Sequence, residues 1–142
     1  MTRAPGSSQT DRPPGFNLTM ANAPETVAEA RRLVRTAYEA WGVEDYTDTA
    51  QLVISELVTN AVRHSPGPCI RVIVQHPLPG HLLLAVVDKS RTLPFMQNPH
   101  TDELSGRGLL LVDALADNWG ITRLPWGKRV WAHIHAKTGQ QQ

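Results

Sequence analysis

Three polar side chains stand four residues apart in an otherwise apolar segment: Glu56, Asn60 and His64. Residues at this spacing lie on one face of an α-helix, so the three would form a single row. Asn is unfavourable in the middle of a helix because its side chain competes for backbone hydrogen bonds. The row is either the solvated rim of an amphipathic helix, or a carboxylate and an amide oxygen that face a Mg²⁺ ion. Such an ion takes one or two protein oxygens beside phosphate oxygens and waters.

A second chemical group is Asp88, the first polar residue after the apolar run 82–87. A carboxylate at the buried end of a strand is costly unless water or a dedicated donor satisfies it. Asp88 either caps the turn that follows the strand or accepts a hydrogen bond from an exocyclic amine of a ligand at the bottom of a pocket.

A third signal is the triplet Gly106-Arg107-Gly108, which precedes the apolar segment 109–117. If a helix begins at Leu109, its free N–H groups favour an anion, and the glycines let a phosphate approach the backbone. Arg107 would add a charge-assisted donor. The alternative is a flexible helix start with an ordinary exposed arginine.

The hydrophobic pattern predicts the elements that position these residues, because apolar side chains recur at helical spacing in some segments and alternate with polar ones in others. The expected order is a strand at 16–20, helices at 24–41 and 47–64, strands at 70–75 and 82–87, a loop at 89–105, a helix at 109–117, and strands at 120–124 and 128–135. This order predicts an α/β sandwich with the helices on one face of the sheet. The strand at 82–87 is wholly apolar, which favours burial on both faces.

Length and composition fit one domain, expected over residues 16–136, with a disordered tail at 1–15 and a flexible tail at 137–142. The chain has 142 residues, and 14 Lys and Arg against 13 Asp and Glu leave a net charge of +1. This balance excludes a strongly basic nucleic-acid or membrane-surface binder. The single cysteine excludes an internal disulfide, and there is neither a secretory signal nor an apolar run of about 20 residues. We therefore expect a cytoplasmic protein.

Together these motifs resemble the Bergerat-fold ATPases, the superfamily of gyrase-type and histidine-kinase ATP-binding domains. Residues 56–64 resemble the N-box, Asp88 with Ser90 and Pro94 resembles a shortened G1 box, and residues 106–112 resemble the G2 box. The closing segment 127–132 resembles the last strand of the compact anti-sigma-factor kinase branch. The resemblance spans roughly residues 16–136. It implies a two-layer α/β sandwich with a mixed, mostly antiparallel sheet and helices on one face.

The resemblance also implies a function. It points to a stand-alone ATP-binding regulator of the actinobacterial type, with ATP and Mg²⁺ as cofactors. Such a protein binds a sigma factor, or phosphorylates a Ser or Thr of an anti-anti-sigma antagonist, and relatives often form homodimers. The implied activity is that of an ATP-dependent serine/threonine-protein kinase, a transferase in transcription regulation. The alternative is a non-catalytic interaction module that responds to nucleotide.

Individual roles follow from the matched motifs. The resemblance makes Glu56 the general base and Asn60 the Mg²⁺ ligand, and it makes Asp88 the acceptor for the adenine amino group. The remaining nucleotide-binding residues that it implies are Ser90, Gly106, Arg107, Gly108 and Leu109, and residues 89–105 match the ATP lid.

The chain departs from the family pattern at two places. Ser90 and Thr92 stand where the wider superfamily has G1 glycines, and Arg129 stands near a Thr or Ser that contacts the adenine region in many relatives. Outside these motifs, His133 and His135 share a strand face at the spacing of a metal pair. Without a third ligand in register, an outward strand face is the favoured interpretation.

Overall fold

The structure is a computed structural model that describes residues 14–90 and 103–137, with the backbone alone for residues 103–108. In chain order the elements are β1 (Gly15–Ala21), α2 (Thr26–Trp41), the short 3₁₀-helix η1 (Glu44–Tyr46), α3 (Thr47–His64), β2 (Cys69–Leu78), β3 (His81–Asp88), α4 (Glu103–Leu115), β4 (Asn118–Leu124) and β5 (Gly127–His135). This order confirms the arrangement that the hydrophobic pattern predicts.

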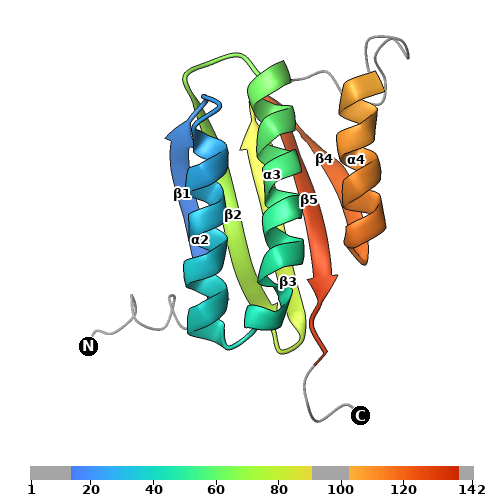
Figure 1. Ribbon diagram of the computed structural model, residues 1–142. Helices are drawn as coiled ribbons and strands as arrows, with labels where there is room; N and C mark the ends of the chain where they lie inside the picture. Colours follow the sequence, from blue (N-terminus) through green and yellow to red (C-terminus); the bar gives the residue numbers. More distant parts are fainter. Residues whose placement is uncertain (1–13, 91–102, 138–142) are drawn as a thin grey trace, which may run out of the picture.

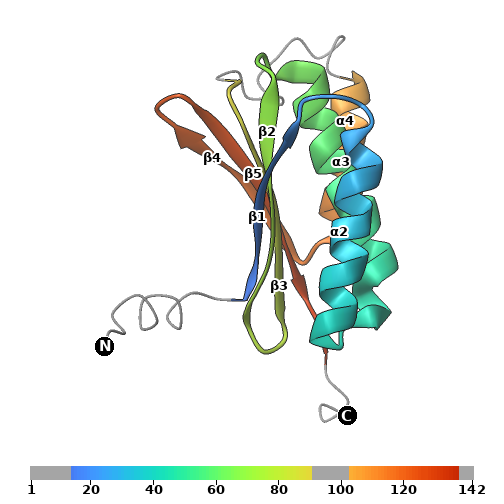
Figure 2. The same cartoon turned by 90° about the vertical axis from the view of Figure 1, so that its left-hand side faces the viewer.

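The five strands form one sheet in the order β1-β2-β3-β5-β4. Figure 1 shows α2, α3 and α4 in front of it, and the view in Figure 2 shows that all three lie on the same side. The two-layer sandwich is therefore confirmed. The sheet was expected to be mixed and mostly antiparallel, and each of its four pairings in the described residues is antiparallel.

The core lies between the sheet and the helices, because alternate strand residues point toward the helical layer. The register places Val72, Val86 and Val130 in one row across three strands, and all three are buried. On the other face of β3, Leu83 and Val87 keep part of their surface exposed. The prediction that β3 is buried on both faces is therefore wrong for these two side chains, since no described element covers that face.

Hydrogen bonds connect α2 to α3. Arg31 Nη1 on α2 donates to Ser55 Oγ at 2.8 Å and to the Gln51 carbonyl oxygen at 3.3 Å. Gln51 Nε2 returns a hydrogen bond to the Arg31 carbonyl oxygen at 2.9 Å. Helix α2 ends at Trp41 and is capped by Gly42, whose φ of 72° is a left-handed conformation that favours glycine. The predicted bounds of both helices are confirmed to within two residues.

Helix α4 begins at Glu103, six residues before the predicted start at Leu109. Gly106, Arg107 and Gly108 therefore lie in its first two turns rather than at its mouth. Each glycine inside a helix costs about 1 kcal/mol relative to alanine, which is why the sequence pattern predicts a later start. Leu109 and Val112 are buried in the core, and this packing outweighs the local preference.

Most of the predicted lid and most of the two predicted tails lie outside the described residues. Residues 91–102 of the lid segment, together with 1–13 and 138–142, lie outside the described residues, and 103–105 belong to α4. Strand β1 begins at Gly15, which the sequence pattern assigned to the tail. Among the described residues, no helix is both long and apolar enough to cross a membrane.

Candidate functional site

The predicted row of polar residues is present on α3, where Asn60 is buried and Glu56 and His64 are half-buried. Asn60 is only 7% exposed, and its Oδ1 is buried without a hydrogen-bond partner among the described residues. Glu56, one turn earlier, is half-buried. Leaving a buried acceptor unpaired costs about 1–3 kcal/mol, so such an atom requires an explanation. The Asn60 oxygen is well suited to receive a ligand.

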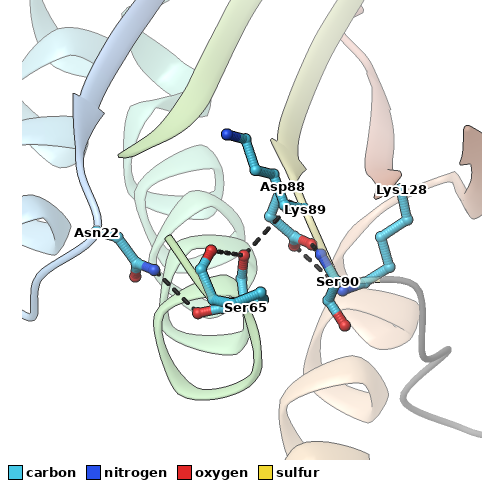
Figure 3. Close-up of polar contacts among 7 residues, drawn as sticks. Asn22, Ser65, Asp88, Lys89, Ser90 and Lys128 are labelled. Atoms are coloured by element: carbon cyan, nitrogen blue, oxygen red, sulfur yellow. Dashed lines mark hydrogen bonds and ion pairs between the residues drawn. The ribbon is translucent and has the colours of Figure 1, made fainter. Parts of the chain in front are cut away.

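Asp88 lies at the end of β3, on the face that meets the helices. The antiparallel register places it directly opposite Lys128 of β5. Both residues are buried, and Lys128 Nζ lies 3.1 Å from each carboxylate oxygen of Asp88. Figure 3 shows the lysine side chain extended along the strand end toward the carboxylate. Each partner compensates the charge that the other would otherwise carry into a low-dielectric environment.

The Asp88 carboxylate also caps the chain that leaves β3. Ser90 N donates to Asp88 Oδ1 at 2.8 Å, the geometry expected when an Asp side chain bonds a backbone N–H two residues on. Of the two roles considered for Asp88 from the sequence, the cap on the turn after the strand is therefore confirmed. Ser90 is itself buried.

Gly127 allows β5 to start this close to Asp88. A Cβ atom placed on Gly127 would overlap the carbonyl oxygen of Asp88. The overlap would be with backbone, so no rotamer could relieve it. Glycine at this position brings the Lys128 side chain within reach of the carboxylate.

A further network ties the end of α3 to the end of β3. Lys89 N donates to Ser65 Oγ at 3.2 Å, directly beside Asp88. Asn22 Nδ2, from the segment after β1, donates to the carbonyl oxygens of Ser65 and Gly67 at 3.0 and 2.9 Å. Figure 3 shows the contacts of Ser65 with Asn22 and Lys89 together with the Asp88–Lys128 pair. The α3 terminus, and with it the row of Glu56 and Asn60, is therefore held at the Asp88 end of the sheet.

The sequence analysis did not single out Lys128 and noted only that Arg129 departs from the family pattern near the adenine region. Strand alternation places Lys128 and Val130 on the face toward the helices and Arg129 on the opposite face. The signal that could have found Lys128 is its position two residues before a core valine in the last strand.

The G2 residues are only partly described. Leu109 is a core side chain with 7% exposure. The side chains of 103–108 are not described, so the phosphate contacts predicted for Gly106, Arg107 and Gly108 remain predictions.

The histidines of β5 lie on the open face of the sheet. His133 Nε2 and His81 Nδ1 are 2.8 Å apart and share a hydrogen bond, and the His81 and His135 rings are 5.2 Å apart between centroids. No group of three His, Cys, Asp or Glu side chains in the described part of the chain could hold a metal ion. His133 and His135 thus lie on the face of β5 that points away from the helices, as the alternation along the strand predicts.

Comparison with known families identifies the class of protein. Residues 20–134 match the model of the Histidine kinase-like ATPase domain, which is most of the chain. The protein therefore belongs to the histidine kinase-like ATPase domain family. A search of curated proteins found no match.

Two solved structures are similar. The RsbU and RsbW domains of Rv1364c from Mycobacterium tuberculosis match with a TM-score of 0.66 and 19% sequence identity, over 86% of this chain and 32% of that one. The histidine kinase domain of the Erythrobacter litoralis EL346 blue-light activated histidine kinase matches with a TM-score of 0.47 and 19% identity, over 78% and 60% of the two chains. At these identities the first likeness establishes the fold, and this chain spans only about a third of that protein.

Proposed function

We propose that this protein binds Mg·ATP at the end of the sheet where α3, β3 and β5 meet, and that it regulates transcription as an anti-sigma-type serine/threonine kinase. The observation that carries the proposal is the buried Oδ1 of Asn60, which has no hydrogen-bond partner in the part of the chain that the structure describes and lies on a helix whose sequence resembles an N-box. Membership of the histidine kinase-like ATPase domain family supports it.

The residues present fit a Mg²⁺ ion that is shared with a nucleotide. No three protein ligands converge in the described residues, but Mg²⁺ is usually bound through one or two protein oxygens plus substrate phosphates. Asn60 Oδ1 would be the protein ligand. When bound, the ion would neutralise phosphate charge.

The other residues would bind different parts of the nucleotide. Asp88 would accept a hydrogen bond from the exocyclic amine of the base. Gly106, Arg107 and Gly108, at the start of α4, would lie under the phosphates, where small residues and a cation favour close approach.

Phosphoryl transfer to a protein hydroxyl needs little from the protein beyond positioning and charge stabilisation. In the proposed reaction the hydroxyl oxygen of a Ser or Thr forms a bond to the γ-phosphorus, the bond to the β–γ bridging oxygen breaks, and ADP leaves. The Glu56 carboxylate takes the hydroxyl proton. Its place one turn from Asn60 on the same face of α3 supports this role.

The proposed partner is an anti-anti-sigma antagonist or a sigma factor, and the protein acts in the cytoplasm. The similar mycobacterial structure contains a domain named RsbW, which supports a partner of this kind. The exposed face of α2 offers one docking surface, since Arg32 and Arg35 are exposed there while Arg31 is engaged with α3.

Equilibrium binding of ATP and ADP, with and without Mg²⁺, tests the site. We expect ATP binding to depend on Mg²⁺ in the unsubstituted protein and to lose that dependence in Asn60→Ala. Thr59→Ala, at the neighbouring position on α3, is the matched control and should bind as the unsubstituted protein does. Absence of binding at millimolar nucleotide would overturn the proposed function.

A phosphotransfer assay distinguishes the proposed kinase from a non-catalytic interaction module. We expect Glu56→Gln to bind ATP normally and to lose at least about 100-fold in the transfer rate, the usual contribution of general base catalysis. Asp48→Asn changes an exposed carboxylate two turns earlier on α3 and should leave the rate unchanged. The measurement follows radiolabelled phosphate from ATP onto anti-anti-sigma proteins of the same organism. Binding without any transfer would instead support a non-catalytic, nucleotide-responsive interaction module.

A further inference from the structure

The hydrogen-bonding capacity of Asp88 is nearly used up within the protein. An ionised carboxylate has about four acceptor positions, two on each oxygen. In the described residues, Oδ1 accepts from Ser90 N at 2.8 Å and from Lys128 Nζ at 3.1 Å, and Oδ2 accepts from Lys128 Nζ at 3.1 Å. Counting donors from the described residues, one position is left, and it is on Oδ2.

The surroundings of that position are set by Lys128. Its ammonium group lies 3.1 Å from Oδ2, and the side chain has no exposed surface. A ligand donor that reaches Oδ2 therefore brings its neighbouring atoms close to a buried positive charge. If the ligand atom next to this donor is a hydrogen-bond acceptor, the positive charge of Lys128 stabilises it. A second donor or a C–H group at that place gains no such stabilisation. The difference is large because charge–dipole interactions are strong where water is excluded.

We infer that Lys128 is a positioning residue that determines the base selectivity of this site. It limits Asp88 to a single ligand donor and favours a base edge in which an amino group stands beside a ring nitrogen that carries a lone pair, as in adenine. Lys128 acts through Asp88 and through its charge, without touching the ligand. This inference rests on the proposed function and deepens it, because it concerns the base subsite of the same nucleotide.

Deaza analogues of ATP test the inference directly. In 1-deaza-ATP and 7-deaza-ATP, one of the two ring nitrogens nearest the amino group becomes C–H while the amino group remains. We expect at least one analogue to bind the unsubstituted protein about fivefold more weakly than ATP, measured by calorimetry. In Lys128→Met the same analogue should bind as ATP does, whereas Lys128→Arg, which keeps the charge, should retain the discrimination.

Inosine triphosphate provides the internal control. A carbonyl acceptor replaces the amino donor in this nucleotide and N1 gains a hydrogen, so the donor at the amino position is lost and a carbonyl oxygen faces Asp88. We therefore expect weak binding to both the unsubstituted protein and Lys128→Met. A purely structural role of Lys128 would lower the stability of the variant but would leave the ratio of deaza-ATP to ATP affinity unchanged.

The outcomes separate the two proposals. Equal affinity of ATP and both deaza analogues for the unsubstituted protein would overturn the inference, as would discrimination that persists in Lys128→Met. The first comparison needs no variant, so the test holds even if Lys128→Met does not fold. Failure of every nucleotide to bind would overturn the proposed function, and the inference with it.

Discussion

At the residue scale, the central feature is the buried pair of Asp88 and Lys128. Neither side chain has appreciable exposed surface, and their closest atoms are 3.1 Å apart. A buried ion pair contributes little net stability when intact, but removing one partner leaves the other as an uncompensated charge. Variants of Asp88 therefore affect folding as well as any ligand.

We expect Asp88→Asn to lower the free energy of unfolding by about 3–5 kcal/mol, because Lys128 then remains charged in a buried position. The double variant Asp88→Asn with Lys128→Met should regain most of that loss. Urea unfolding followed by circular dichroism measures both. Lys89→Met, an exposed lysine next in the chain, is the control. An Asp88→Asn protein as stable as the unsubstituted one would show that the pair is not buried as described.

At the scale of elements, the site depends on how closely β5 starts beside the end of β3. Gly127 is buried, and a Cβ there would overlap the Asp88 carbonyl oxygen. The segment after β1 adds a second constraint, since Asn22 holds the loop that follows α3. The candidate site is therefore assembled by strand and loop contacts, and α3 only carries its polar row.

We expect Gly127→Ala to destabilise the protein by more than about 2 kcal/mol, because the new methyl group meets backbone rather than a movable side chain. Gly42→Ala is the matched glycine control. Its φ of 72° disfavours alanine, but its Cβ would meet no atom within 4 Å, so we expect a loss of only about 1 kcal/mol. Thermal unfolding compares the two. Equal losses would contradict the steric explanation.

At the scale of the whole molecule, the sheet has one face covered by helices and one face with a histidine cluster. Burial lowers the pKa of His133 from its ordinary value of 6.5, and the charges of His81 and His135 lower it further, while Asp117 opposes them. In a folded protein this group therefore resists protonation more than in the unfolded chain.

The expected consequence is a pH-dependent loss of stability. As the pH falls through about 6.5, the unfolded chain binds a proton at His133 before the folded protein does, so the free energy of unfolding decreases until the pH passes the lower, folded-state pKa. We expect a smaller decrease between pH 7.5 and pH 5 in His133→Gln than in the unsubstituted protein, measured by urea unfolding. An identical pH dependence in the two proteins would contradict this assignment. The effect is modest because the ring is only partly buried.

The element order and the polar row were determined by the sequence alone. Periodicity identified α2 and α3 because each helix has a continuous apolar face, and the four-residue spacing of Glu56 and Asn60 is a local property of a helix. The position of Asp88 at the end of an apolar strand could likewise be predicted from the sequence. These features depend on residues that are close together in the chain, so a single sequence is enough to predict them.

Only the tertiary structure decided the partner of Asp88, the burial of Asn60 and the start of α4. Lys128 is 40 residues from Asp88 in the chain, and strand register brings them together. The position of α4 depends on packing of Leu109 against the core, which outweighs the local cost of the glycines. Register and burial arise from contacts between distant segments, and such contacts leave no periodic trace in the sequence.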